Sequence, residues 1–298
     1  MAFETIAILG PGEMGAAVGK AFHDKGLTVM TCLDGRSAST CERATAAGFH
    51  DVPDLETLLG EAEIVLSILP PGKAPILARN VANAMAKSGQ TPPYVDMNAV
   101  SPGTALAMQS DIEGAGAVYI DGGIVGSPPG KSIPTRFFVS GPEAGLMEGL
   151  DGLGIDVRQC GPEIGHGVAI KMCYAAITKG TSALHTAVLM AAESLGVADE
   201  LHQELALSVS QIYKRMENVV PKLPAVSARY ISEMKEIAKT MESAGMTPNF
   251  HVAATELYQA LEKTPFATER RDTIDPNRTL RQTLEVCARG LPSKSAAK

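Results

Sequence analysis

The first half of the chain alternates short apolar runs with longer segments of helical periodicity. The apolar runs are rich in β-branched side chains and end at proline, glycine or polar residues. Such an alternation is typical of a parallel β-sheet covered by helices. We expect strands at 5–9, 28–33, 64–69, 94–97, 117–120, 136–140 and 155–159, and helices at 12–25, 39–47, 75–87 and from Pro102 onward, with Ser101 as the N-cap.

The pattern changes after Gly161, where the strand-like runs stop. Proline and glycine then separate stretches of helical periodicity, which we expect to form helices at 164–195, 198–219, 224–243, 249–262 and 277–289, with a loose tail at 290–298. The sequence therefore predicts an α/β N-terminal domain over 1–162. It predicts an all-α C-terminal domain over 163–298 that begins with a long interdomain helix.

Composition and charge exclude several classes of function. The net charge of −7 argues against a protein that grips nucleic acid or an anionic membrane. The five cysteines contain no C-x-x-C and the six histidines show no ligand spacing, so we expect neither a disulfide framework nor a metal. We see no signal peptide and no apolar run long enough to cross a membrane. These features predict a cytoplasmic, enzyme-sized protein that acts on a small molecule.

A glycine-rich loop follows the first predicted strand directly and opens the first predicted helix. Its sequence is Gly10-Pro11-Gly12-Glu13-Met14-Gly15, which has the form G-x-G-x-x-G. In this context Gly10 permits a tight turn, Gly12 lets the backbone approach a pyrophosphate, and Gly15 allows close helix–strand packing. The helix N-terminus offers unpaired N–H groups to the phosphates. We therefore expect a Rossmann-type dinucleotide site that includes Glu13 and Met14.

The end of the second predicted strand carries the residues that choose between NAD and NADP. An acidic residue here usually binds the ribose hydroxyls of NAD, whereas a 2′-phosphate needs cationic and hydroxyl partners. The chain offers both, because Asp34 and Gly35 precede Arg36 and Ser37, with Thr40 close by. Gly35 leaves room for Arg36 to face a phosphate. We expect NADP rather than NAD, while a solvated Arg36 is the alternative.

Four motifs together carry a resemblance to a known family. They are the glycine loop with its Met14, D-M-N-A-V-S-P at 96–102, D-G-G-I-V-G-S at 121–127 and G-H-G-V-A-I-K at 165–171. In this order and spacing they resemble the motifs of the β-hydroxyacid dehydrogenase superfamily, which includes 3-hydroxyisobutyrate and 6-phosphogluconate dehydrogenases. The resemblance implies that 121–127 is the substrate loop and that Lys171 is the catalytic lysine.

Finer details are similar to a less characterised branch of that superfamily. They are G-R-S-A-S-T at 35–40, Lys171-Met172, T-K-G at 178–180 and the segment 228–236. The branch has a helical C-terminal domain of unassigned role, and it implies NADP binding without a known substrate. The resemblance also implies a homodimer formed through the helical domain.

Hydride transfer at a carbon requires a proton to leave or join the substrate oxygen. Lys171 serves this purpose if burial and a nearby oxidised nicotinamide lower its pKa toward neutrality. A lysine that extends to the helix rim is the structural alternative. The family's asparagine after the lysine is missing, since Tyr174 and Ala175 stand there. Helical spacing places Tyr174 and Thr178 on the face of Lys171, so we expect them to bind substrate or simply to pack.

Further candidates lie at predicted strand ends, where α/β sheets bind their ligands. Asn98 follows a strand directly and is a candidate for nicotinamide or substrate binding, with a local turn bond as the alternative. Gly126 and Ser127 belong to a glycine- and proline-rich loop that suits close approach of a substrate. Leu69 and Pro70 are expected to line the cofactor.

The leading hypothesis is an NADP-dependent oxidoreductase that acts on a β-hydroxy acid or a related alcohol/carbonyl pair, with Lys171 as general acid/base. An imine or enamine reductase on the same fold is the second hypothesis, because the usual asparagine is missing. A non-catalytic cofactor-binding protein is the third. Lys179 and Arg229 are candidate clamps for an anionic group, with solvated charges as the alternative.

Overall fold

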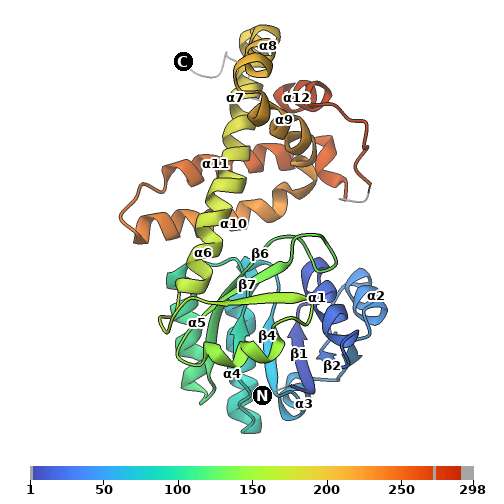
Figure 1. Ribbon diagram of the computed structural model, residues 1–298, viewed down its shortest axis with the longest axis vertical. Helices are drawn as coiled ribbons and strands as arrows, with labels where there is room; N and C mark the ends of the chain where they lie inside the picture. The colour runs from blue at the N-terminus through green and yellow to red at the C-terminus, as the bar shows by residue number, and fades with distance from the viewer. Residues whose placement is uncertain (1–2, 271–272, 290–298) are drawn as a thin grey trace. The chain divides into compact units, whose positions relative to one another are not determined.

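The computed structural model describes residues 3–270 and 273–289, and its internal contacts divide the chain after Tyr174 into two units (Figure 1). The first unit contains every strand and the second is helical, which confirms the predicted fold class. The strands end at Gln159, near the change that the sequence places at residue 162. The division by contacts comes later because one further helix packs on the sheet of the first unit. The predicted tail at 290–298 lies outside the described residues.

One eight-stranded sheet forms the centre of the first unit, in the order β3-β2-β1-β4-β5-β6-β7-β8. All neighbouring strands are parallel except β6 and β7, which are antiparallel (Figure 1). The strands are β1 (Thr5–Leu9), β2 (Thr28–Thr31), β3 (His50–Asp51), β4 (Ile64–Ser67), β5 (Tyr94–Asp96), β6 (Tyr119–Val125), β7 (Thr135–Ser140) and β8 (Ile155–Gln159). The sheet is thus mostly parallel, as the sequence pattern predicts, with one antiparallel pair.

Helices of the first unit are amphipathic and bury their apolar side chains. They are α1 (Glu13–His23), α2 (Ala38–Ala46), α3 (Leu55–Glu61), α4 (Ala74–Ser88), α5 (Pro102–Gly114) and α6 (His166–Ala175), with the 3₁₀ helices η1 (Pro71–Lys73) and η2 (Ala144–Leu150). Ile6 and Ile8 of β1 join Val18 and Phe22 of α1 in the core, all fully buried. Such burial of apolar side chains stabilises the fold by about 1.5–3 kcal/mol per large residue.

Besides the two 3₁₀ helices, one strand and one α-helix of the first unit were not predicted. The edge strand β3 has only two residues, both exposed and polar, so it carries no apolar pattern. Helix α3 is too short to show a clear helical periodicity in the sequence. The feature that marks it is its N-cap, since the Asp54 carboxylate accepts a hydrogen bond from Thr57 N at 2.8 Å. The cap predicted at Ser101 is confirmed, because its hydroxyl accepts a bond from Thr104 N at 3.2 Å.

Strand β6 corrects the expected position of the substrate loop. Residues 121–125 are buried strand, and only Gly126 and Ser127 of the motif lie in a loop. The two glycines that resembled a loop serve close packing instead. A Cβ atom at Gly122 would lie 2.5 Å from Met97 Sδ, so only glycine fits there without a shift.

The second unit consists of helices. The sequence predicted where the helical regions lie, but not every break between the helices. They are α7 (Thr181–Leu195), α8 (Ala198–Ser208), α9 (Ser210–Val219), α10 (Ser227–Ser243), α11 (Asn249–Glu262) and α12 (Leu280–Arg289). The π-helical segment η3 (Ala176–Gly180) precedes α7, and the 3₁₀ helices are η4 (Val220–Lys222), η5 (Pro224–Val226) and η6 (Pro265–Thr268). The predicted helix 198–219 is wrong as one element, because Val209 leaves helical geometry with φ −136° and ψ 45°.

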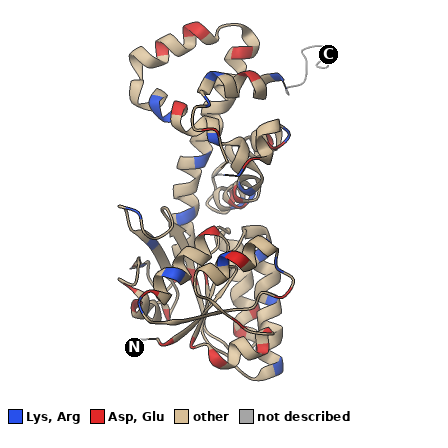
Figure 2. Cartoon of the chain, turned by 90° about the vertical axis from the view of Figure 1, so that its right-hand side faces the viewer, with Lys and Arg blue, Asp and Glu red and all other residues tan. Residues whose placement is uncertain are grey.

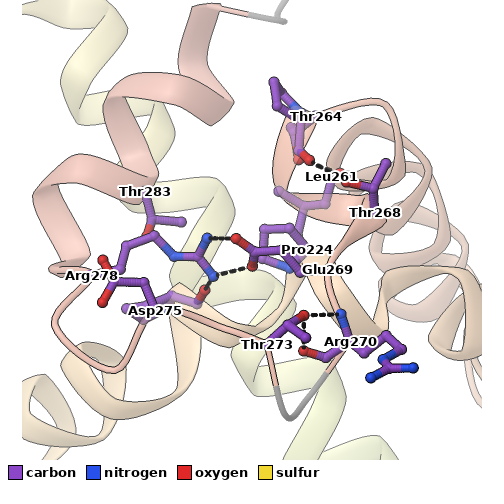
Figure 3. A network of polar contacts seen from close by, with 12 residues as sticks. Pro224, Leu261, Thr264, Thr268, Glu269, Arg270, Thr273, Asp275, Arg278 and Thr283 are labelled. Carbon is purple, nitrogen blue, oxygen red and sulfur yellow. Dashed lines mark hydrogen bonds and ion pairs between the residues drawn. The ribbon is translucent and has the colours of Figure 1, made fainter.

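A buried arginine ties the loop before α12 to the rest of the second unit (Figure 3). The Arg278 guanidinium donates to both carboxylate oxygens of Glu269 at 2.7 Å and to Pro221 O at 2.8 Å. It also lies 4.0 Å from the centre of the Phe266 ring. Such bidentate pairs have fixed geometry. Arg278 thus joins Glu269 and Pro221 to the residues directly before α12.

Several apolar side chains on α7 and α11 are exposed, including Leu184 and Phe250 at 63% and 77%. The predicted homodimer through this unit stays a prediction.

Figure 2 shows basic and acidic residues interspersed along the helices, in keeping with a net charge of only −7 over 298 residues. Within the described part of the chain, no helix is both long and apolar enough to cross a membrane.

Candidate functional site

The glycine loop has the geometry that a pyrophosphate requires. Gly10 has φ +98°, and a Cβ atom there would lie 2.6 Å from Ile68 O. A Cβ at Gly15 would collide with Gly10 O, so this glycine serves close packing of α1 against β1. At Gly12, in contrast, a Cβ would meet no protein atom within 4 Å. Gly12 is also the N-cap of α1 and supplies no side-chain cap, so its open side suits a ligand phosphate.

The turn after β2 gathers a cation and hydroxyl groups at the start of α2. Arg36 is half-buried, and Gly35 before it has φ +67°. Ser37 is the N-cap of α2, yet its hydroxyl bonds Thr40 Oγ1 at 2.9 Å and caps no backbone N–H group. Asp34 is exposed beside this cluster. The arrangement can hold a phosphate at the N-terminus of α2.

Asn98 lies just after β5 and is 2% exposed. Its amide group donates to Ser67 Oγ at 2.8 Å and to Asp96 Oδ1 at 2.5 Å, while its oxygen accepts from Leu69 N at 2.6 Å. Both amide hydrogens are therefore used within the protein, one by the nearby Asp96 and one by Ser67 at the end of another strand, and a ligand role of Asn98 stays a prediction. Asn98 fixes the backbone at Leu69, next to Pro70. It positions the segment expected to line the cofactor.

Two carboxyl groups are buried side by side under the site. Asp96 on β5 and Asp121 on β6 are paired in register, and both are fully buried. Burial raises the pKa of Asp96 to about 7, opposed by hydrogen bonds from Asn98 and reinforced by the charge of Asp121. Burial likewise raises the pKa of Asp121. Desolvation dominates because a carboxylate loses its hydration in the interior.

We expect the free energy of unfolding to fall as pH rises from about 4 to about 7. The unfolded chain releases the Asp96 proton near its ordinary pKa, whereas the folded protein keeps it up to about 7. The fall is at most about 4 kcal/mol. Urea unfolding between about pH 5 and pH 8 measures it, and Asp96→Asn should flatten the dependence. The exposed Asp111→Asn is the control. A wild-type stability that rises through this window contradicts the assignment.

The Asp121 carboxylate also anchors the helix that carries Lys171. Its Oδ2 accepts hydrogen bonds from Gly165 N and Val168 N, both at 3.1 Å, and from Ser140 Oγ at 2.8 Å. Ser140 Oγ in turn accepts a bond from Gly167 N at 2.9 Å. Negative charge at a helix N-terminus is favourable. The start of α6 is therefore fixed to β6 and β7 by three bonds, and a fourth joins Asp121 to Ser140.

Lys171 lies against the sheet one turn further along α6. A Cβ atom at Gly123 would collide with Lys171 Cβ, so the helix approaches β6 at van der Waals distance. Since α6 meets Asp121 first and Gly123 next, it runs toward the carboxyl end of β6. Lys171 is half-buried. Its position is thus set by glycine at 123 and by the anchored start of the helix.

Comparisons with known proteins agree with this geometry. Residues 5–151 match the NAD binding domain of 6-phosphogluconate dehydrogenase, and residues 192–261 match a domain of unknown function (DUF1932). The conserved protein MTH1747, described as structurally similar to 3-hydroxyacid dehydrogenases, is 27% identical with a TM-score of 0.65. That match covers 87% of this chain and 96% of MTH1747. The chain belongs to the β-hydroxyacid dehydrogenase superfamily.

Two further proteins are similar to the chain over most of its length. A 28.5 kDa protein of Methanothermus fervidus is 26% identical over 260 residues, which cover 87% of this chain and 99% of that protein. Mycobacterium tuberculosis 3-hydroxyisobutyrate dehydrogenase, solved with L-serine, has a TM-score of 0.67 at 19% identity. The match covers 96% of this chain and 99% of the mycobacterial chain. At this identity the similarity shows the fold alone. The N-terminal unit is thus an NAD(P)-binding domain in an oxidoreductase family.

The lysine helix departs from the superfamily pattern beyond Lys171. Tyr174 lies 46% exposed in the last turn of α6, and Thr178 lies inside the π-helical segment η3. The helix expected over 164–195 is observed as α6, η3 and α7, and its α-helical period is broken in η3, because a π-turn holds more residues than an α-turn. The 3.6-residue spacing that put Thr178 on the face of Lys171 therefore does not hold through η3. The substrate roles of Tyr174 and Thr178 stay predictions.

The other candidates divide between loop and helix surface. Gly126, with φ +117°, and the exposed Ser127 begin the loop between β6 and β7. Thr135 Oγ1 donates to Ser127 O at 2.6 Å and closes this loop. In the second unit, the Lys179 ammonium is ion-paired with the buried Glu233 carboxylate. Arg229 Nε lies 3.5 Å from the same carboxylate, so both cations already have an acidic partner.

Sequence reasoning gave no role to three residues that shape this site, Asp121, Ser140 and Arg136. Asp121 and Ser140 bond α6 across 47 and 27 residues of sequence. Arg136 is a cation inside the otherwise uncharged strand β7. Its presence in an apolar run was the signal that could have singled it out, because strands seldom carry an unpaired charge into a buried layer.

Proposed function

We propose that the protein transfers a hydride between NADP(H) and a β-hydroxy acid or its oxidised carbonyl form, with Lys171 as general acid/base. The hydride leaves the hydroxyl-bearing carbon in one direction and joins the carbonyl carbon in the other. The observation that carries this proposal is the placement of Lys171 against Gly123, on the helix that Asp121 anchors. The bound nicotinamide would accept or supply the hydride. Lys171 would hold or release the proton of the substrate oxygen, since hydride transfer alone leaves that oxygen charged.

The substrate class is supported by two relatives. MTH1747 resembles 3-hydroxyacid dehydrogenases, and the mycobacterial 3-hydroxyisobutyrate dehydrogenase was solved with L-serine. L-Serine itself bears a hydroxyl on the carbon next but one to the carboxyl carbon. A second candidate, the reduction of an imine, is favoured by Tyr174 and Ala175 at the position of the family's asparagine.

We propose NADP rather than NAD as the cofactor. Arg36 is half-buried, and none of the described residues forms an ion pair with it. The hydroxyl groups of Ser37 and Thr40 lie with it at the start of α2. A 2′-phosphate bound there would gain a charge-assisted hydrogen bond from Arg36.

Titration of nucleotide fluorescence tests the cofactor assignment. We expect NADPH to bind more tightly than NADH, and Arg36→Ala to weaken NADPH about 10- to 100-fold while NADH is little changed. Arg43→Ala, on the exposed surface of α2, is the matched control. Equal losses for both nucleotides would show that Arg36 does not contact the 2′-phosphate. A wild-type preference for NADH would overturn the assignment.

A further inference from the structure

Arg136 occupies a defined position at the carboxyl edge of the sheet. It is the second residue of β7 and pairs with Val125, the last residue of β6. Its Nη2 would lie 3.1 Å from a Cβ atom on Gly126, so the guanidinium rests on the first residue of the loop between the two strands. Gly126 keeps this place open because it has no side chain.

The side chain of Arg136 lies on the same face of the sheet as α6. Residues directly opposite each other in antiparallel strands share a face, and alternate residues of a strand do too. Asp121 faces Ser140, Gly123 faces Phe138 and Val125 faces Arg136. The first of these pairs bonds α6, and Gly123 touches Lys171. Arg136 is therefore one pair beyond Lys171, about 7 Å further along the strands.

The guanidinium is half-buried without an acidic partner. Among the residues that the structure describes, none forms an ion pair or hydrogen bond with Arg136. Arg158 on the neighbouring strand β8 differs, because it is paired with Asp156 at 2.7 Å. Removing a charge from water costs free energy unless an opposite charge or hydrogen bonds compensate. The position of Arg136 thus calls for an anion from outside the chain.

That anion is not a phosphate of the nucleotide. In the sheet, β7 is separated from β1 by three strands and from β2 by four. At about 4.8 Å per strand, Arg136 is roughly 19 Å from the strand that leads into the glycine loop. It is roughly 24 Å from β2, which precedes Arg36. The anion that reaches Arg136 must therefore belong to the molecule beside Lys171.

We propose that Arg136 binds the carboxylate of the substrate and makes the site selective for hydroxy acids over neutral alcohols and imines. The inference rests on the proposed function, because it takes Lys171 to face the substrate's hydroxyl oxygen. A guanidinium matches a carboxylate with two parallel N–H···O bonds, which orient as well as attract. The acid is held at one end by Arg136, and its hydroxyl carbon is directed to the lysine.

Calorimetry on the NADPH-loaded protein tests the proposal by binding alone, because the reduced nucleotide cannot accept a hydride from a hydroxy acid. The probes are 3-hydroxy acids of three to six carbons and the primary amides of the same acids, which have the same shape without the charge. We expect the wild type to bind at least one acid about 10- to 100-fold more tightly than its amide. Arg136→Gln should abolish that preference by weakening the acid alone, while NADPH binding is unchanged.

Arg158→Gln is the matched control, and it should retain the preference for the acid. Arg136→Lys keeps the charge but loses the paired bonds, so we expect an intermediate preference even if the glutamine variant folds poorly. The proposal is overturned if Arg136→Gln keeps the wild-type ratio of acid to amide. It is also overturned if the wild type binds no acid, or binds amides as well as acids, while NADPH is bound. Loss of NADPH binding by the wild type contradicts the proposed function instead.

Discussion

Replacing Lys171 with methionine is expected to lower turnover by about 10²- to 10⁴-fold and to leave NADPH affinity unchanged. Methionine keeps the length of the side chain and its packing against Gly123, but it cannot hold or release a proton. The substrate oxygen would then exchange its proton only with water. The nucleotide should bind as before, because Lys171 lies against β6, which two strands separate from the strand that leads into the glycine loop.

The steady-state rate is measured across pH from the absorbance of the nicotinamide. The substrate is the 3-hydroxy acid that gives the highest rate with the wild type. In the wild type, one limb of the pH profile should report the lysine, and Lys171→Met should lose that limb. Lys25→Met is the control, since Lys25 is exposed in the turn after α1. A lysine that only extends to the helix rim would give near-normal turnover in Lys171→Met, and that result would refute the general acid/base role.

Arg278→Met should cost about 3–5 kcal/mol of the free energy of unfolding, because it leaves a buried carboxylate without its partner. Arg278 is 5% exposed in its side chain, and Glu269 is 23% exposed. The variant also loses the bond to Pro221 O and the contact with the Phe266 ring. Figure 3 shows the Arg278 guanidinium with both of its bonds to the Glu269 carboxylate.

Urea unfolding followed by circular dichroism measures this cost, with Arg281→Met as the matched control. Arg281 pairs with Asp199 at 3.0 Å, but both side chains are more than half exposed. An exposed pair contributes only about 0–1 kcal/mol. The double variant with Glu269→Gln should recover part of the loss, since no unpaired charge stays buried. Similar losses for Arg278→Met and Arg281→Met would show that burial does not govern this pair.

The sequence predicted elements best where one physical signal dominates. β1 and β8 have the predicted bounds, and so does α11, because apolar runs or a sustained helical period define them. The glycine loop was located because strand, glycines and helix follow each other directly. β3 was missed because two exposed polar residues at a sheet edge carry no hydrophobic pattern.

The site was predicted less completely because its geometry depends on distant partners. The Asn98 side chain bonds Ser67 and Leu69 at the end of another strand, 31 and 29 residues away in sequence, so its role cannot be seen from its neighbours along the chain. The buried strand 121–125 was mistaken for a loop because the reason for its glycines, the approach of Met97 and Lys171, is tertiary. The π-turn in η3 has no local signature of the kind that periodicity provides.

We propose above all that this superfamily member binds a nicotinamide nucleotide beside Gly12 and exchanges a hydride with it. Fluorescence titration of the unaltered protein with NADPH and NADH tests this proposal most directly. We expect saturable binding well below millimolar concentration, tighter for NADPH, and oxidation of the bound NADPH when the matching 3-oxo acid is added. Binding of neither nucleotide below about millimolar concentration would contradict it.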